Sequence, residues 1–123
     1  MILLDTNILI EIIRKNGEII RKCDDLGTSN LAISSITRYE FLLGSRDKKS
    51  FTDNLRFVGK FQTIPINEEI DMVFSHLCEK YALSHRPSIP DILIAATVLH
   101  HAYLLYTLNT RDFRFIPDIQ FVI

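Results

Sequence analysis

The segment MILLDTNILIEII, residues 1–13, changes its hydrophobic pattern at a single carboxylate, Asp5. Residues 1–4 form a continuous apolar run that is too short for a helix and suits a buried strand. After Asp5 the apolar residues recur with helical spacing, at Ile8, Leu9, Ile12 and Ile13. The segment therefore predicts a strand, a tight turn at residues 5–7 and an amphipathic helix.

The length and composition of the chain indicate how many domains it has and which broad type of protein it is. Its 123 residues are enough for one hydrophobic core, so we expect a single domain spanning residues 1–123. The apolar content of 47% and the charged content of 24% are both typical of a soluble globular protein. A net charge of −1 gives no indication of a strongly basic nucleic-acid binder or of an acidic tail. Phosphate binding would therefore depend on local basic patches or on metal ions.

Cysteine usage and hydropathy bear on the cellular compartment. Cys23 and Cys78 are far apart and form no CxxC pattern, which is typical of free thiols in a reducing cytosol. No apolar run reaches the length of a transmembrane helix. The apolar N-terminus has no basic leader and no small-residue cleavage site, so it does not resemble a signal peptide. We therefore expect a cytoplasmic protein.

Strands and helices are predicted to alternate along the rest of the chain. The further strands are expected at residues 30–34, 61–66, 103–108 and 119–123, with Pro65 limiting the second of these to an edge or a strand end. The further helices are expected at residues 18–26, 36–44, 47–59, 67–83 and 90–102. Strands that are apolar on both faces and are separated by helices predict an α/β fold with a parallel sheet covered by helices.

Two carboxylates follow predicted strands. Asp5 comes directly after the first strand, and Asp112 follows the strand at residues 103–108. In open α/β sheets, binding sites gather at the carboxyl ends of the strands. Each acid also has a purely structural explanation. Asp5 or one of its neighbours would cap the following helix, and Asp112 would be a turn residue paired with one of the two nearby arginines.

Two further carboxylates lie in predicted helices. Glu40 falls beside a helical stripe made by Ile36, Tyr39 and Leu43, where an unpaired charge is costly unless a basic group such as Arg38 pairs with it. Asp91 stands in the first turn of the helix at residues 90–102, which is apolar almost all round and is expected to be buried. The structural alternative for Asp91 is a capping box with Ser88.

A parallel sheet would bring these four acids toward one edge. Like charges about 4 Å apart repel by roughly 4 kcal/mol at an effective dielectric of about 20. Such a group therefore takes up protons or binds divalent cations. Oxygen ligands without His or Cys suit Mg²⁺ or Mn²⁺ better than zinc. Convergence of the four acids would thus predict a divalent-metal site.

Four segments carry a family resemblance. LDTN (4–7), YEFLLGS (39–45), PDILIAA (90–96) and TLNTRDF (107–113) occur in the order and spacing of a PIN domain. The chain resembles the VapC-type toxins of prokaryotic toxin–antitoxin pairs along essentially its whole length. The resemblance implies a PIN-like three-layer α/β/α fold with a central, mostly parallel sheet.

The resemblance also implies a Mg²⁺- or Mn²⁺-dependent endoribonuclease. It implies that the catalytic and metal-binding residues are Asp5, Glu40, Asp91 and Asp112. Asp5 and Asp91 are expected to be the primary ligands, and many relatives have another residue at the position of Asp112. Polar residues expected to line the same site are Asn7, Thr107 and Asn109. Water as the nucleophile would leave 5′-phosphate and 3′-hydroxyl ends, and the implied substrate is a tRNA or ribosomal RNA loop.

The sequence and the resemblance also indicate which residues contact the RNA substrate and which proteins bind the chain. Candidates for contacts with RNA phosphates, each of which is otherwise a solvated surface residue, are Arg46, Lys48, Lys49, Arg86, Arg111 and Arg114. The resemblance implies a small antitoxin whose C-terminal segment wraps the toxin, and a homodimer. The early helices are rich in Ile and Leu and could leave apolar surface for a partner.

Two other function classes compete with the nuclease. A phosphatase with an acidic Mg²⁺ pocket would need an acid two residues after Asp5, where Asn7 stands. A receiver-like phosphotransfer domain would need a lysine on a late strand, and residues 103–108 contain none. A non-catalytic RNA- or protein-binding module of the PIN fold would be expected to lose at least one of the four acids, and a metal titration distinguishes it.

Overall fold

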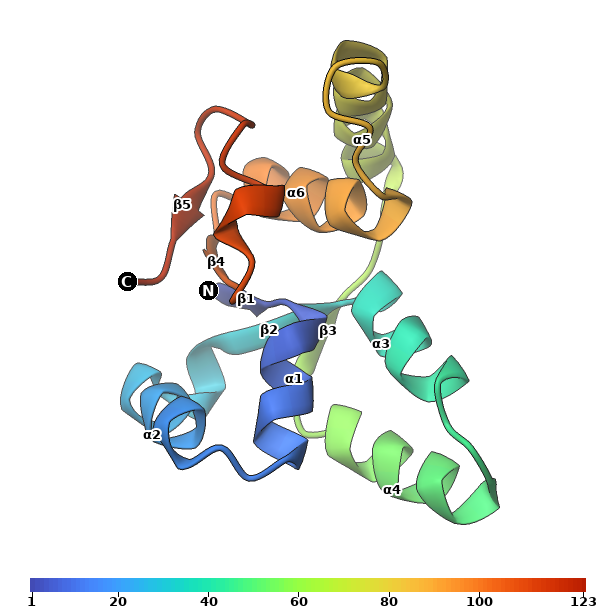
Figure 1. The fold of residues 1–123 in the computed structure, drawn as a ribbon, viewed down its shortest axis with the longest axis vertical. Helices are drawn as coiled ribbons and strands as arrows, with labels where there is room; N and C mark the ends of the chain where they lie inside the picture. The colour runs from blue at the N-terminus through green and yellow to red at the C-terminus, as the bar shows by residue number, and fades with distance from the viewer.

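A five-stranded, wholly parallel sheet forms the centre of the computed structural model, which describes residues 1–123 (Figure 1). The strands are β1 (Ile2–Leu4), β2 (Leu31–Ser34), β3 (Gln62–Ile64), β4 (Leu104–Tyr106) and β5 (Gln120–Phe121), in the order β3-β2-β1-β4-β5. The expected α/β fold with a parallel sheet is confirmed.

Six α-helices connect and cover the strands, and each begins at a polar residue whose side chain accepts a backbone N–H. The helices are α1 (Thr6–Ile13), α2 (Gly17–Leu26), α3 (Ser35–Leu43), α4 (Lys48–Val58), α5 (Glu68–Tyr81) and α6 (Ile89–His101). Their capping residues are Asp5, Asn16, Ser34, Asp47, Asn67 and Ser88. These caps satisfy N–H groups that have no partner within the helix, and they explain why five predicted helix starts lie within one residue of the observed ones. The predicted turn at residues 5–7 is wrong in part, because α1 begins at Thr6.

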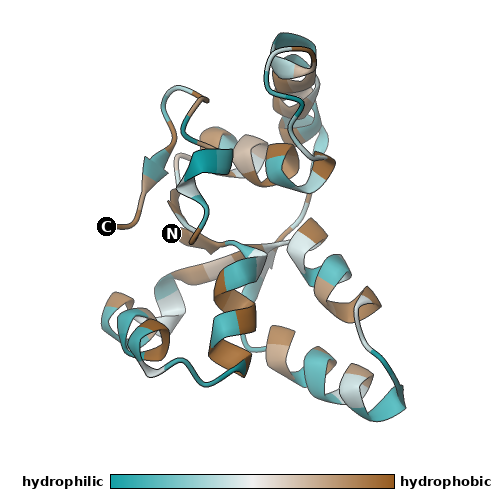
Figure 2. Cartoon of the chain, viewed as in Figure 1, coloured by the Kyte–Doolittle hydropathy of each residue, from teal (hydrophilic) through white to brown (hydrophobic).

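Helices lie on both faces of the sheet, which gives three layers (Figure 1). Leu3 packs into one hydrophobic cluster with residues of α5 and α6. Its neighbours Ile2 and Leu4 pack into a second cluster with residues of α1, α2 and α4. Successive side chains of a strand point to opposite faces, so an apolar run such as ILL serves both clusters. In Figure 2 β1 is hydrophobic throughout, whereas the helices alternate between hydrophobic and hydrophilic residues.

The regular strands are shorter than the apolar runs that predict them. The run at residues 103–108 forms ladder pairs only over Leu104–Tyr106, and the run at 119–123 only over Gln120–Phe121. β3 is an edge strand that ends just before Pro65, as expected of a residue that cannot donate to a ladder. The residues that follow the paired part of each strand therefore form the carboxyl edge of the sheet.

The connections change direction beside β1. From β1 the chain proceeds outward to β2 and β3 on one side, then returns to place β4 and β5 on the other side. In open α/β sheets such a reversal leaves a crevice at the carboxyl ends of the two strands concerned, here β1 and β4. No helix in the structure is both long and apolar enough to span a bilayer.

Candidate active site

Asp5 lies directly after β1 and is held in one orientation by three hydrogen bonds. Its Oδ1 accepts the Thr6 N–H at 2.8 Å. Its Oδ2 accepts the Thr107 hydroxyl at 2.7 Å and the Asn7 amide at 3.3 Å. The residue is only 7% exposed. Asp5 therefore does cap α1, as the structural alternative predicts, and the same carboxylate is held rigidly at the end of a strand.

Thr107 and Asn7 join the ends of β1 and β4. The Asn7 amide donates to the Thr107 hydroxyl at 3.3 Å, and its oxygen accepts the Leu108 N–H at 3.2 Å. The Thr107 hydroxyl also accepts the Asn109 N–H at 3.0 Å. Thr107, which the resemblance implied to line the site, is buried behind Asp5 and supports it from there. The network fixes the spacing between two segments that lie about one hundred residues apart in the chain.

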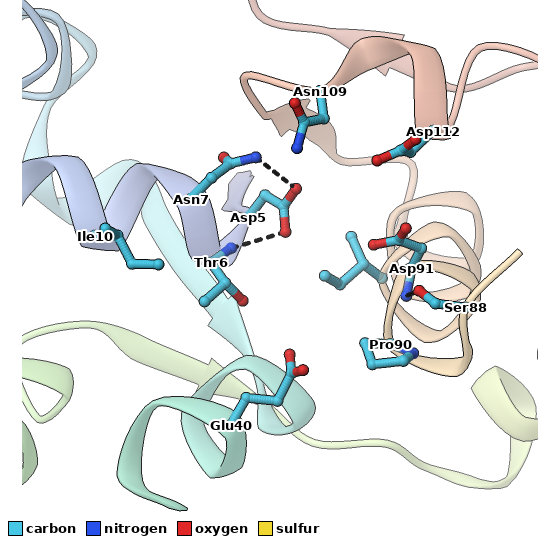
Figure 3. Close-up of a pocket in the computed structure, with 11 residues that line it drawn as sticks. Asp5, Thr6, Asn7, Ile10, Glu40, Ser88, Pro90, Asp91, Asn109 and Asp112 are labelled. Carbon is cyan, nitrogen blue, oxygen red and sulfur yellow. Dashed lines mark hydrogen bonds between the residues drawn. The ribbon is translucent and has the colours of Figure 1, made fainter. Parts of the chain in front are cut away.

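All four predicted acids line one cavity of about 440 Å³ at the carboxyl ends of β1 and β4. They come from four separate segments: the turn after β1, α3, α6 and the short 3₁₀ turn Thr110–Asp112. Figure 3 shows their carboxyl groups directed toward the same space. The other lining residues are Thr6, Asn7, Ile10, Ser88, Pro90, Ile94 and Asn109.

No basic side chain forms an ion pair with any of these four acids. The only ion pairs in the structure are Arg14–Glu11 and Arg56–Asp53, and neither involves a cavity residue. The expected structural alternatives, a pair between Glu40 and Arg38 and a pair between Asp112 and a nearby arginine, are therefore wrong. The cavity is lined by four acids and by no Lys or Arg.

Burial and mutual repulsion raise three of the carboxyl pKa values. Burial is the main cause for Asp5, and the charge of Asp112 adds to it, while the bonds from Thr107 and Thr6 act in the opposite direction. Burial is also the main cause of the raised pKa of Asp91; a hydrogen bond from Ser88 opposes it, and the charges of Asp5, Asp112 and Glu40 add to it. The pKa of Glu40 is raised by the partial loss of water around its carboxyl group and by the charge of Asp5. The folded chain thus holds uncompensated negative charge in this cavity.

Glu40 reaches the cavity, but not for the reason that the sequence suggested. The stripe of Ile36, Tyr39 and Leu43 is not a core face, because Tyr39 and Leu43 are exposed. The buried residues of α3 are Ser35 and Thr37, and the partly buried Phe41 and Leu42 pack against the second cluster, so α3 packs with a different face from the predicted stripe. Glu40 itself is an exposed residue whose carboxyl group faces the cavity.

Asp91 stands beside the cap of α6, and a hydrogen bond from the Ser88 side chain lowers the pKa of its carboxyl group. The Ser88 hydroxyl accepts the Asp91 N–H at 3.2 Å, which is the first half of a capping box. The reciprocal bond, from the Ser88 N–H to the Asp91 carboxylate, is absent. Behind Asp91, α6 is buried at Ile92 and from Ile94 to Val98, as predicted for a helix that is apolar almost all round. This packing anchors the acid firmly.

The donor set fits a hard divalent cation that keeps part of its water shell. Every potential ligand atom at the cavity is an oxygen or an amide nitrogen, and neither His nor Cys is present. The structure contains no group of three or more His, Cys, Asp or Glu side chains that could hold an ion directly. Mg²⁺ usually keeps several waters and binds through one or two carboxylates, so the wider spacing of these acids suits it.

The predicted basic residues divide into two groups. Arg86 and Arg111 line a second cavity of about 310 Å³, which shares Ser88, Asp91 and Asp112 with the first. The others line neither cavity: Arg114 is exposed nearby, and Arg46, Lys48 and Lys49 lie at the junction of α3 and α4. Figure 1 places that junction far from α6.

The residues that the sequence did not assign to the cavity follow helical spacing. Ile10 stands three residues after Asn7 on α1, and Ile94 stands three residues after Asp91 on α6. Residues spaced by three or four share one face of a helix, so this rule would have found both. Ser88 was assigned only a capping role, although it also forms part of the cavity wall.

Relatives of the chain match it along nearly its whole length. Ribonuclease VapC19 of Mycobacterium tuberculosis is 30% identical over 129 aligned residues, which cover 98% of both chains. Ribonuclease VapC1 of Methanocaldococcus jannaschii is 33% identical and aligns over 91% of this chain and 78% of its own. The tRNA(fMet)-specific endonuclease VapC of Salmonella typhimurium is 28% identical, with coverages of 96% and 93%.

Solved structures and a family model agree with these relatives. The DNA-bound VapBC structure from Salmonella typhimurium superposes with a TM-score of 0.84 at 27% identity, covering 98% of this chain and 96% of that one. A toxin–antitoxin complex from Klebsiella pneumoniae gives a TM-score of 0.80 at 30% identity, with coverages of 97% and 95%. The model of the PIN domain matches residues 2–118. The expected resemblance is confirmed, and the chain belongs to the PIN-domain family, within its VapC group.

Proposed function

We propose that the chain is a divalent-metal-dependent endoribonuclease and the toxin of a toxin–antitoxin pair. The observation that carries this proposal is one cavity at the carboxyl ends of β1 and β4, lined by four acids and by no basic residue. The ribonuclease and tRNA-endonuclease names of the relatives support RNA as the substrate. We further propose that the cleaved segment lies in a loop of tRNA or ribosomal RNA, where bases are unstacked and accessible.

In this proposal Asp5 and Asp91 are the primary ligands, and Glu40 and Asp112 complete the site directly or through water. A phosphodiester cannot approach four uncompensated carboxylates unless their charge is offset, because like charges repel by several kcal/mol at contact distances. Bound Mg²⁺ or Mn²⁺ acidifies water and stabilises the charge that develops on the phosphate. The raised pKa values of Asp5, Asp91 and Glu40 support a site that gains free energy when a cation binds.

The chain's own groups hold the reacting carboxylates in place. The Thr107 hydroxyl and the Thr6 N–H bond to the charged form of Asp5 and oppose the effect of its burial on its pKa. Asn7 keeps this turn joined to the segment after β4. The Asn109 side chain faces the cavity (Figure 3), and we propose that its amide contacts the substrate phosphate or a water beside it.

Exposed apolar side chains support a protein partner. Ile13 on α1 is 49% exposed, and Phe51 and Leu55 on α4 are 43% and 40% exposed. An apolar cavity of about 170 Å³ lies between α2 and the end of α4. Because similar structures are toxin–antitoxin complexes, we propose that a small antitoxin covers this side. The homodimer, the single domain over residues 1–123 and the cytoplasmic location stay predictions.

The test combines cleavage with an independent measurement of metal binding. Labelled bulk tRNA and ribosomal RNA are incubated with the full chain in Mg²⁺ or Mn²⁺, and in chelator. Asp91→Asn is compared with Asp71→Asn, which removes an exposed acid from the first turn of α5 and therefore matches the change in charge and helix position. Calorimetry with Mn²⁺ reports binding on each variant.

We expect cleavage that needs both the metal and Asp91, and weaker Mn²⁺ binding by Asp91→Asn than by Asp71→Asn. Cleavage that survives chelation or the loss of Asp91 would contradict the proposal. Absence of both cleavage and Mn²⁺ binding would favour a non-catalytic module of the same fold. Product ends carrying 5′-phosphate and 3′-hydroxyl groups are expected from hydrolysis by water.

A further inference from the structure

The second cavity, of about 310 Å³, has a different character from the acidic one. It lies between the loop that joins α5 to α6 and the segment after β4, and it borders the first cavity at Ser88, Asp91 and Asp112, which line both. Its other functional groups are two arginines, Arg86 and Arg111, and two stacked rings, His85 and Phe115. The acidic cavity contains no such combination of cations and aromatic rings.

The His85 ring is held in place before any ligand arrives. It stacks on Phe115 with centroids 4.2 Å apart and planes 9° apart. Buried Tyr81 meets the edges of both rings, at 5.6 Å from His85 and 5.0 Å from Phe115. Ser84 Oγ and His85 Nδ1 are in hydrogen-bond contact at 2.8 Å. His85 is nevertheless exposed, so the ring is a fixed plane at the surface that loses little freedom on binding.

The two arginines are available for an anion. Both are exposed, and neither takes part in an ion pair or a side-chain hydrogen bond to another residue. Arg86 has a φ of 46°, in the left-handed region, where a side chain is unfavourable and glycine is the usual residue. A guanidinium group binds a phosphate through two parallel N–H donors. A planar ring and two free guanidinium groups thus line one space beside the acids.

A single-stranded nucleic acid carries a phosphate group beside each planar base. These two groups match the guanidinium groups and the aromatic ring of this cavity. We infer that the second cavity is a nucleotide subsite in which an RNA base stacks on the exposed face of His85, while Arg86 and Arg111 hold an adjacent phosphate. The inference rests on the proposed ribonuclease function, because it places this nucleotide next to the phosphate cleaved at the acids. Recognition by stacking accepts any base, so the subsite contributes affinity and register more than sequence choice.

The test measures binding, so that its outcome is independent of cleavage. Fluorescein-labelled oligoadenylate is titrated with the full chain carrying Asp5→Asn, because Asp5 does not line the second cavity and its loss stops cleavage under the proposed function. The companion probe is an abasic ribose-phosphate oligomer of the same length. His85→Ala is compared with His85→Phe, which keeps a ring, and with His76→Ala, which removes an exposed histidine of α5 that lines neither cavity.

We expect His85→Ala to raise the Kd for oligoadenylate about tenfold, the size typical of one stacked base. His85→Phe should restore the affinity, and His76→Ala should leave it unchanged. Binding of the abasic oligomer should be the same in all four proteins. An equal loss for both probes, or no loss for either, would overturn the stacking role, as would failure of the parent to bind oligoadenylate. Cleavage of RNA by the wild type is scored separately, so either proposal can fail alone.

The contribution of the two arginines is measured separately, from the dependence of the binding constant on salt concentration. Removing one phosphate contact from a single strand should lower the slope of log K against log[salt] by about 0.7. Arg111→Gln and Arg86→Gln should each show this change with both probes. Arg21→Gln, which removes an exposed arginine of α2 that lines neither cavity, should not. Equal slopes for all three variants would remove the phosphate-binding part of the inference.

Discussion

Replacing Thr107 with valine tests how Asp5 is held, because it removes one hydroxyl and keeps the branched shape of the side chain. Thr107 and Asp5 are 8% and 7% exposed, and the hydroxyl donates to the carboxylate at 2.7 Å. A buried hydrogen bond to a charged acceptor contributes about 1.5–3 kcal/mol. The N–H of Asn109, which bonds to the same hydroxyl, belongs to an exposed residue and can turn to water instead. We therefore expect Thr107→Val to lower the free energy of unfolding by about 2 kcal/mol and Tm by about 8 °C.

The same change should shift the pH dependence of cleavage. The Thr107 bond lowers the pKa of Asp5 against the effect of burial, so its loss raises that pKa further. A smaller fraction of Asp5 is then ionised at a given pH, and the acidic limb of the rate profile should move to higher pH. Raising the pH should restore activity in Thr107→Val, because the carboxylate ionises again. Rates measured with saturating Mg²⁺ across the acidic range report this shift.

Thr97→Val is the matched control. Thr97 is also fully buried, but its hydroxyl donates at 2.7 Å to a neutral acceptor, the Leu93 carbonyl within α6. We expect a smaller destabilisation, about 1 kcal/mol, and an unchanged pH profile. Equal losses of Tm in the two variants, together with identical acidic limbs, would refute the role assigned to the bond between Thr107 and Asp5.

Three further predictions follow from the site and its surroundings. Asp112→Asn should reduce cleavage about tenfold, less than Asp91→Asn, because Asp112 is exposed on a short 3₁₀ turn; steady-state rates compare the two. In chelator, Asp5 stabilises the folded state while its carboxyl group is protonated, because its pKa is higher in the folded chain than in the unfolded one. This stability is fully present below the ordinary pKa of 3.8 and is lost as the pH rises through the folded-state pKa. The Tm of Asp5→Asn relative to wild type should therefore increase with pH in thermal melts, and a constant difference would contradict this. Thr37→Val should stabilise the chain by about 1 kcal/mol in urea titrations, because the fully buried Thr37 hydroxyl has no hydrogen-bond partner.

Local signals predicted most of the fold. A short apolar run, a polar turn and a helical stripe follow one another in the sequence, so β1, α1 and the start of α6 after Ser88 needed no tertiary information, although α1 begins at Thr6, inside the predicted turn. The convergence of the acids also followed, because the carboxyl ends of parallel strands meet at one edge. The inference from spacing within α3 was wrong, because Tyr39 and Leu43 are exposed and the helix packs through Phe41 and Leu42 instead.

Contacts between distant segments could not be predicted in this way. Arg46, Lys48 and Lys49 follow Glu40 closely in sequence, but a helix advances 1.5 Å per residue, and α3 carries them away from the cavity. The stack of His85 on Phe115 joins the loop before α6 to the segment after β4, and neither segment shows a pattern that reveals the other. Thr107 stands just past the ladder pairs of β4, where strand alternation no longer predicts the direction of a side chain.

The arrangement of the acids has an energetic consequence for the whole molecule. The first turns of α1 and α6 both line the cavity, so two helix N-termini face the carboxylates. Each partial positive charge stabilises a nearby acid by about 0.3–1 kcal/mol. The raised pKa values of Asp5, Glu40 and Asp91 show that burial and charge repulsion outweigh the stabilisation by the helix N-termini. The fold therefore leaves a deficit of positive charge in the cavity, and the two apolar clusters on either side of the sheet must hold the acids together until a cation binds.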